Sequence, residues 1–269
     1  MNLYSTLDQA KTALGITTTA DDAALLLHLE DASRHIDRHC GRVFFTEDAT
    51  RYFDGRCGRV LYTDDFLALT EVATDSQLDN TFDGEVWTED TDYSLWPDNS
   101  WPKQGLAEIV NGRYSWNGYA RYVKLTGTWG YGDGLSADPW EATTVTGTVA
   151  TTTGTTLTLS ADDIIAPGHT LKIGTEQLYV SAVSTGVATV KRGVNGTTAA
   201  AHSTAAISTA QYPVDVTRAV AHVAMGLLSR AQHGPYKSER IGDYQYTLMS
   251  EQEENNFLVR ALSGLVKPL

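Results

Sequence analysis

The chain has 269 residues, enough for one large domain or two modest ones with a buried core. Its 20 Lys and Arg residues stand against 33 Asp and Glu residues, which gives a formal net charge of -13. A sequence-independent grip on nucleic-acid phosphates needs clustered basic residues, so this balance argues against one. The chain lacks an apolar run of about eighteen residues and a basic-then-apolar amino terminus, so we expect neither a membrane span nor a signal peptide.

Two helices are predicted near the amino terminus. Ser5-Thr6-Leu7-Asp8 is typical of a capped start and Gly15 of a stop, which predicts a short helix over residues 6–14. A second helix is predicted over residues 21–40, where acids precede apolar residues spaced three and four apart. The apolar stripe consists of Leu25, Leu29, Ala32, Ile36 and Cys40.

Residues 43–131 have the pattern of short strands. Val, Tyr, Phe, Trp and Thr are frequent, and Asp-Gly and Asn-Gly pairs interrupt the runs together with Pro97 and Pro102. Residues 121–129 give the clearest strand, because Val and Leu alternate with polar residues. We expect an antiparallel sheet or a small barrel.

Residues from about 140 to 207 differ in composition, since Thr and Ala dominate and aromatic residues nearly vanish. Turn residues separate short strand-like runs at 156–159, 170–173, 177–183 and 187–191. We interpret this part as a small all-β module inserted into the chain. The two ends of a tolerated insertion should lie close together.

Helix returns at the carboxyl terminus. Pro213 suits a first helical turn and Gly234-Pro235 an end, which predicts a helix over residues 213–233. A last helix is predicted over residues 250–266, with glutamates near its positive end. The polar segment 237–248 between these helices is expected to be extended.

These elements predict an α+β fold with three parts. The N- and C-terminal helices should build a helical bundle, residues 43–131 an antiparallel β-rich middle, and the insertion a small all-β module. The framework would comprise residues 1–132 plus 212–269, and the inserted module residues 133–211.

In their order and spacing, several segments resemble the tailed-phage head-tail connector family, also described as adaptor or head completion proteins. The segments are Tyr4-Ser5-Thr6-Leu7, Tyr52-Phe53-Asp54-Gly55, Val123 to Gly132, Pro213 to Ala219 and Ser238 to Tyr244. Family members commonly run from the Gly-Tyr-Gly turn almost directly into the proline-started helix, so the insertion is a departure. Within it, residues 191–202 look like a Gly/Thr/Ala-rich element of β-modules in other phage structural proteins.

The resemblance implies a structural virion protein that is not an enzyme and needs no cofactor or metal. It implies an adaptor subunit of a homo-oligomeric ring, generally dodecameric, which joins the portal protein of the head to the next tail component, a stopper or nozzle. Such a ring extends the DNA tunnel, and DNA passes without specific binding. The protein would be made in the cytoplasm of the bacterial host and act at the head-tail interface.

Two groups of residues are candidates for this role. Tyr and Arg often anchor interfaces, and an extended strand can pair with a neighbour's sheet edge. We therefore expect assembly or docking at Lys237, Arg240, Ile241, Tyr244 and Tyr246. Because acids repel phosphates, we expect a tunnel lined by acids such as Glu30, Asp31 and Asp37.

The main alternative is a carbohydrate-binding or tail-fibre-type β-module protein. Tryptophans crowd the middle of the chain and could stack on sugars, but a small β-core also uses them to bury area. They are Trp87, Trp96, Trp101, Trp116, Trp129 and Trp140. A glycosidase would need a carboxylate pair such as Glu89 with Asp92, although any protein with 33 acids offers such pairs.

Metal sites have only weak sequence support. Asp79 to Asp90 places acids at positions one, five and twelve of a calcium-type loop, but strand-like residues flank it. His35 and His39 lie one helical turn apart without a further ligand at motif spacing. Cys40 and Cys57 are too widely spaced for a zinc pair, and we expect free thiols in a reducing cytoplasm.

Overall fold

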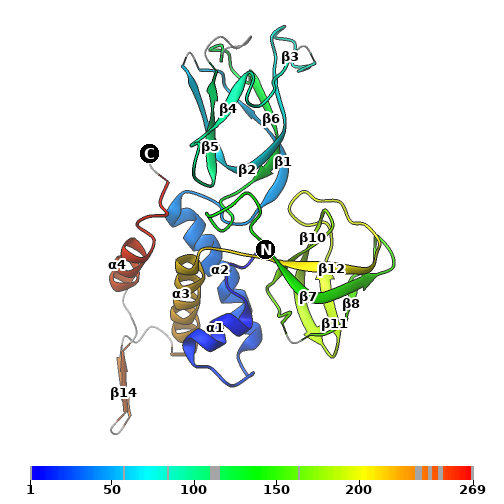
Figure 1. The fold of residues 1–269 in the computed structure, drawn as a ribbon. Helices are drawn as coiled ribbons and strands as arrows, with labels where there is room; N and C mark the ends of the chain where they lie inside the picture. The colour runs from blue at the N-terminus through cyan, green and yellow to red at the C-terminus, as the bar shows by residue number, and fades with distance from the viewer. Residues whose placement is uncertain are drawn as a thin grey trace. The chain divides into compact units, whose positions relative to one another are not determined.

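The computed structural model describes residues 2–56, 58–83, 85–109, 116–162, 164–233, 238–241, 244–247 and 251–267. Helices and antiparallel sheets both occur among them (Figure 1), so the predicted mixture of helix and sheet is confirmed. None of the described helices is long and apolar enough to cross a membrane.

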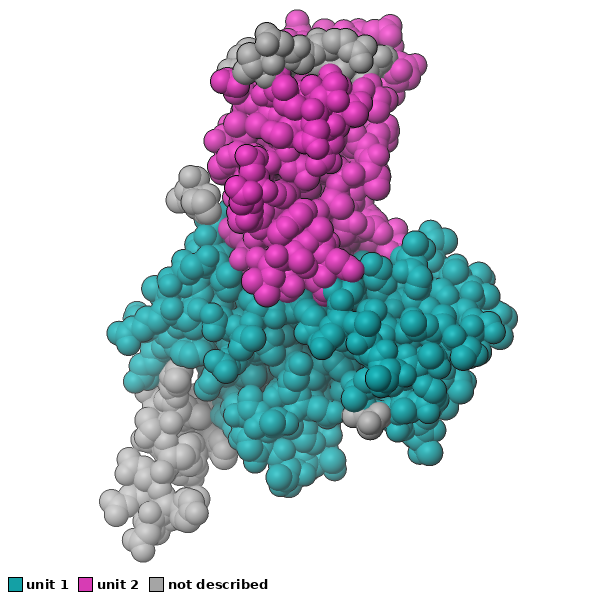
Figure 2. Space-filling view, in the orientation of Figure 1, with its two compact units in different colours: residues 1–41, 140–194, 198–269 teal, residues 42–139, 195–197 magenta. Residues whose placement is uncertain are grey.

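The chain folds into two compact units, which Figure 2 distinguishes by colour. Unit 1 contains residues 1–41, 140–194 and 198–269, and unit 2 contains residues 42–139 and 195–197. Unit 1 therefore holds the helices and a barrel, and unit 2 holds an open sheet. The division predicted from the sequence, into a framework and an inserted module, is a different one. It follows the order of segments along the chain, and it stays a prediction.

The first two helices of unit 1 are α1 (Leu7–Leu14) and α2 (Asp22–Cys40). The Thr6 hydroxyl accepts the Gln9 N–H at 3.2 Å and the Gln9 side chain accepts the Thr6 N–H at 3.0 Å, so the predicted capped start is a complete capping box. Gly15 and Gly41 end the two helices in the left-handed conformation. All five residues of the predicted α2 stripe are buried, which confirms the face that packs inward.

The last two helices are α3 (Val214–His233) and α4 (Glu251–Ala261). Helix α3 begins directly after Pro213, whose carbonyl accepts the Thr217 N–H at 3.1 Å. It contacts α1, α2 and α4, so it is the central helix of unit 1. Its buried residues include Val216, Val220, Val223 and Leu228, which recur at steps of three to five along the helix.

Helix α4 is shorter than predicted, because the helix expected over residues 250–266 ends at Ala261. The Leu262 N–H still bonds the Leu258 carbonyl at 2.9 Å, but the Leu265 N–H bonds the Leu262 carbonyl at 2.8 Å. This change from a four-residue to a three-residue step tightens the chain into a turn around Gly264. The Lys267 N–H then bonds the Cys40 carbonyl at 2.8 Å, at the end of α2.

Between α3 and α4 the chain forms a two-stranded antiparallel sheet of β13 (Ser238–Ile241) and β14 (Tyr244–Thr247). The predicted extended segment is therefore a pair of strands.

The barrel of unit 1 is closed, with the strand order β10-β11-β8-β7-β12-β9. Trp140 and Ala210 are paired at its base, so the expectation that the ends of the insertion lie close together is confirmed. Its interior is filled with aliphatic residues from every strand, such as Leu157, Leu171, Leu178 and Ile207. The strands are β7 (Trp140–Val149), β8 (Thr156–Leu159), β9 (Thr170–Ile173), β10 (Glu176–Ser184), β11 (Val187–Lys191) and β12 (His202–Ala210).

Unit 2 is an antiparallel sheet of order β1-β6-β2-β5-β4, with β3 paired to β2. Strand β6 lies between β1 and β2 and alternates buried and half-buried residues, as predicted for the clearest strand of the sequence. On its core side Trp87 stacks on Trp116, with ring centroids 4.0 Å apart. The strands are β1 (Glu47–Phe53), β2 (Val60–Thr74), β3 (Glu85–Val86), β4 (Tyr93–Trp96), β5 (Lys103–Glu108) and β6 (Val123–Trp129).

Gly127 allows β6 to lie between β1 and β2. It faces Ala49 of β1 and Leu69 of β2, next to irregularities in the β2 register. A Cβ atom at this position would lie 2.1 Å from the Ala68 carbonyl oxygen and 2.9 Å from the Leu69 Cα. Both are backbone atoms, so a side chain here can be accommodated only if the sheet itself shifts.

We predict that Gly127→Ala destabilises the protein by about 1–3 kcal/mol, the usual range for forcing extra atoms into a packed site. Gly58→Ala is the control, because no atom lies within 4 Å of a Cβ built there. Thermal unfolding of both variants measures the difference, and equal melting temperatures for the two would contradict the prediction.

Candidate assembly sites

The expected docking residues lie on the two-stranded sheet between α3 and α4, except for one. Arg240 and Ile241 belong to β13, and Tyr244 and Tyr246 belong to β14. Lys237 lies outside the described residues. The register pairs Ile241 with Tyr244 and Ser238 with Thr247. The assembly role of these residues stays a prediction.

The three acids expected to line a tunnel have different environments on α2. Asp31 is exposed, whereas Glu30 is half-buried. Burial and the nearby charge of Glu30 raise the pKa of Tyr179 to about 12. Asp37 accepts the Tyr4 hydroxyl at 2.6 Å and pairs with Arg34 at 3.2 Å, and its side chain is only 13% exposed. Whether these acids face a tunnel stays a prediction.

The Asp37 contact is part of a network that docks the amino terminus onto α2. The Tyr4 N–H is donated to the Ser33 hydroxyl at 3.2 Å, and Arg34 donates to the Asn2 carbonyl at 3.0 Å. Burial and the negative charge of Asp37 raise the pKa of Tyr4 well above its usual value. Tyr4, which opens the first segment of the family resemblance, is therefore a buried anchor of the chain start.

The same amino-terminal segment also contacts the barrel. The Leu7 N–H is donated to the Pro167 carbonyl at 3.2 Å, and the Thr170 hydroxyl is donated to the Asn2 side chain at 3.3 Å. Gly168 has a positive φ of 99°, and a Cβ there would lie 3.0 Å from the Leu3 side chain. A larger residue at Gly168 would be strained and would push this joint apart.

The barrel contains a buried ionic cluster centred on Glu176. Its carboxylate is bound in a bidentate manner by Arg192, with Nε–Oε1 at 2.6 Å and Nη2–Oε2 at 2.7 Å. The backbone N–H groups of Gly193 and Ala200 donate to the same carboxylate at 3.1 and 3.0 Å. The His202 Nε2 lies 2.8 Å from Oε2. Glu176 is fully buried, and every one of these partners lies within the 191–202 element.

We call Glu176, Arg192 and His202 together the clasp. The clasp holds both ends of the loop 193–201, since Gly193 stands at its start and Ala200 near its end. Arg192 also donates to the Thr151 and Gly154 carbonyls at 3.0 and 2.9 Å, which fixes the neighbouring turn. The repeated small residues of the sequence element are explained by this close packing of backbone around one carboxylate.

The residues considered as metal ligands from the sequence have local structural contacts instead. Asp79 accepts both the backbone N–H and the hydroxyl of Thr81, and these hydrogen bonds lower the pKa of Asp79. Burial and the nearby His35 lower the pKa of His39. Within the described ranges, no three His, Cys, Asp or Glu side chains are grouped so as to hold a metal ion. Cys40 is buried, and Cys57 lies outside the described residues.

The tryptophans divide between core and surface. Trp87, Trp116 and Trp129 are buried in the core of unit 2. Trp96 is 36% exposed and meets Tyr62 edge-on, with ring centroids 5.3 Å apart. The composition of the sequence did not distinguish these two groups, because burial depends on which strand face each ring occupies.

The carboxylate pair considered for hydrolysis is divided between different environments. Asp92 is buried and accepts the Thr88 N–H at 2.9 Å, while Glu89 is exposed. Burial and the charges of Glu89 and Asp90 raise the pKa of Tyr93 to about 12. Asp92 therefore serves to fix the turn before β4.

Residues 4–74 match the family model described as phage gp6-like head-tail connector protein. This region includes α1, α2, β1 and β2, and over it the predicted family resemblance is confirmed. The match supports a structural connector role in a phage virion. Comparisons with curated proteins and with solved structures found no match.

We predict that Glu176→Gln destabilises the protein by about 3–5 kcal/mol at neutral pH, because it leaves the buried Arg192 without a counter-charge. Glu71→Gln is the control, since Glu71 pairs with Lys124 at 2.9 Å and both side chains stay partly exposed, at 34% and 24%, where such pairs contribute about 0–1 kcal/mol. Chemical denaturation of both variants measures the two effects, and similar losses would contradict a special role for the clasp.

The clasp should also give the protein a specific pH dependence. Burial by itself would raise the pKa of Glu176, but hydrogen bonds from Arg192, Ala200, His202 and Gly193 lower it to about 2 from its model-compound value of 4.5. The resulting stabilisation is complete above pH of about 4.5 and is lost as the pH falls toward 2. Unfolding measured from pH 7 to pH 2 should show this loss in the native protein and a weaker dependence in Glu176→Gln.

Proposed function

We propose that this chain is an adaptor subunit of the ring that joins the portal vertex of a phage head to the tail and extends the DNA tunnel. The observation that carries the proposal is the match of residues 4–74 to the gp6-like connector family. Helix α3 and the three described helices that contact it, α1, α2 and α4, are the proposed bundle of each subunit. The proposed partners are identical subunits in a dodecamer, the portal protein, and a stopper or nozzle component of the tail.

The two-stranded sheet β13–β14 supports the proposed site of assembly. Each of its strands has only the other as a partner among the described residues, so each has an outer edge. A two-stranded sheet by itself is marginally stable in water, and an additional strand or a packing surface stabilises it. We propose that a neighbouring subunit or the portal supplies this partner by main-chain hydrogen bonding.

The charge distribution supports passage of DNA without retention. Residues 42–139 contain 8 Lys and Arg against 17 Asp and Glu, which is a net charge of -9 out of the -13 of the whole chain. The acidic excess is therefore concentrated in unit 2 rather than in α2, where the tunnel acids were expected. In a ring of such subunits, like charge would repel DNA phosphates wherever this excess faces the tunnel.

The second candidate function is carbohydrate binding, and the exposed pair of Trp96 and Tyr62 is the observation that favours it. Their rings stand at 87° to each other, so they do not form one flat platform. The Lys103 ammonium lies over the face of the Trp101 ring, 4.5 Å from its centroid, on a face that a sugar would need. A glycan array compared between the native protein and Trp96→Ala tests this function, because a sugar site would lose binding in the variant.

We predict that the native protein forms rings, either free in solution or on portal-bearing heads. Mass photometry of the purified protein and negative-stain microscopy of reconstituted heads would detect them. A protein that stays monomeric in both settings and is absent from virions would refute the adaptor proposal.

We predict that the double variant Arg240→Ala with Tyr244→Ala folds normally but is not added to portal-bearing heads. Circular dichroism checks the fold, and sedimentation of heads with bound protein measures addition. Arg218→Ala with Tyr119→Ala is the control, because it removes the same two side-chain types from exposed positions on α3 and in unit 2. Equal addition by both double variants would exclude β13–β14 as the docking site.

We also propose that the inserted module is dispensable for folding of the framework. Replacing residues 141–209 with a short Gly/Ser linker should leave soluble, helical protein, because Trp140 and Ala210 are already adjacent. Its melting temperature should be lower, since Leu7 loses its hydrogen bond to Pro167 and Leu3 loses cover from Gly168. Insoluble protein with every linker length would show that the module is integral.

A further inference from the structure

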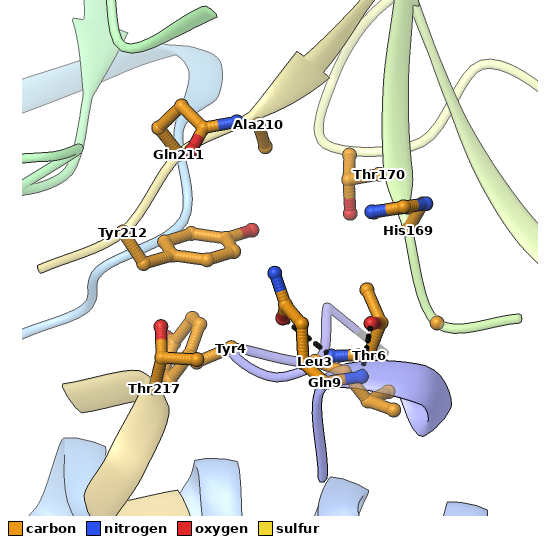
Figure 3. Close-up of a pocket in the computed structure, with 11 residues that line it drawn as sticks. Leu3, Tyr4, Thr6, Gln9, His169, Thr170, Ala210, Gln211, Tyr212 and Thr217 are labelled. Carbon is orange, nitrogen blue, oxygen red and sulfur yellow. Dashed lines mark hydrogen bonds between the residues drawn. The ribbon is translucent and has the colours of Figure 1, made fainter. Parts of the chain in front are cut away.

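A small polar pocket lies within unit 1, where the amino terminus, the barrel and the start of α3 meet (Figure 3). Its volume is about 50 Å³. The lining comes from Leu3 to Gln9, from Gly168 to Thr170 at the start of β9, from Ala210 to Tyr212 after β12, and from Thr217 of α3. The pocket therefore touches three segments that are far apart in the sequence.

The Tyr212 hydroxyl faces this pocket and is shielded from bulk solvent (Figure 3). Its geometry gives it no hydrogen bond to another described residue. Thr170 lies close enough to oppose the rise in the pKa of Tyr212, but the Thr170 hydroxyl is donated to the Asn2 side chain. Burial raises the pKa of Tyr212, so the hydroxyl keeps its proton. A buried hydroxyl without a hydrogen-bond partner is unfavourable, so the pocket is expected to hold a molecule that supplies one.

Other polar groups converge on the same space. The Gln9 Oε1 accepts the Thr6 N–H at 3.0 Å, which leaves the Gln9 amide hydrogens as donors, and the amide nitrogen points toward the Tyr212 hydroxyl (Figure 3). The Thr170 oxygen retains lone pairs that can accept. A water molecule placed between these groups would have two to four partners, which is the number that buried water usually makes.

The pocket suits a neutral occupant. None of its lining residues is Asp, Glu, Lys or Arg, so neither a cation nor an anion would find a counter-charge. Burial lowers the pKa of His169 to about 4, although the nearby Asp8 opposes this, so the imidazole is uncharged at neutral pH. The His169 Nδ1 accepts the Ala166 N–H at 3.0 Å, which assigns the ring proton to Nε2.

We propose that this pocket binds a small cluster of ordered water molecules that join the amino terminus, the barrel and α3. One water needs about 10–15 Å³ measured in this way, so the volume holds a few. The waters complete the hydrogen bonding of Tyr212, Gln9 and Thr170. Water-mediated hydrogen bonds would then connect the barrel to the amino terminus, in addition to the direct hydrogen bond from the Leu7 N–H to the Pro167 carbonyl.

Tyr212→Phe tests the proposal, because a hydrated pocket and a dry pocket give opposite signs. In a hydrated pocket the hydroxyl is satisfied by water, and its removal lowers the melting temperature by about 2–4 °C. In a dry pocket the hydroxyl is unsatisfied, and its removal leaves the melting temperature unchanged or raises it. Tyr4→Phe is the matched control, because it removes a hydroxyl that donates to Asp37 at 2.6 Å and must lower the melting temperature.

A structure of the full chain at a resolution that shows water is the second measurement. We expect density for water within hydrogen-bonding distance of the Tyr212 hydroxyl in the native protein, and its loss or displacement in Tyr212→Phe. An empty native pocket would overturn the proposal whatever the melting temperatures. A higher melting temperature for Tyr212→Phe, with Tyr4→Phe lowered, would overturn it as well.

Discussion

The docking of residues 2–7 is the constraint on which the rest of unit 1 depends. This short segment bonds α2 through Tyr4 and Asn2, the barrel through Leu7 and Asn2, and α1 through the Thr6 cap. Tyr4 also packs edge-on against Tyr212 at 4.8 Å, next to the start of α3. This one short segment thereby holds α1, α2 and the barrel, which make few contacts with one another. A buried network of this kind can stabilise a structure by more than the sum of its separate hydrogen bonds.

The barrel is stabilised in a different way, by a buried charge that is fully satisfied. Burying an isolated carboxylate is costly, and Glu176 is tolerated because Arg192, two backbone N–H groups and His202 surround it. The arrangement gives the loop 193–201 one defined conformation. Part of that loop, residues 195–197, belongs to unit 2, where the Asp48 N–H bonds the Asn195 carbonyl at 2.9 Å.

These joints are consistent with a connector, whose work is to hold surfaces in fixed positions. The family match covers α1, α2 and the first two strands of unit 2, and the barrel lies outside it. The barrel is closed, so it has no sheet edges and does not offer unpaired strands to partners. The sheet β13–β14 has such edges, and it stands between two helices where a partner could complete it.

The sequence by itself determined the local elements. The caps and apolar spacing defined α1 and α2 to within one residue, and β8, β9 and β11 lie at the predicted positions, because these signals act between close neighbours. Strands β7 and β12 were missed, since their Thr- and Ala-rich runs lack strong alternation and are fixed by pairing with each other. Only the tertiary structure brought Asp37 to Tyr4, 33 residues away, and Glu176 to Arg192, 16 residues away. Such contacts depend on how the chain closes, which no local spacing encodes.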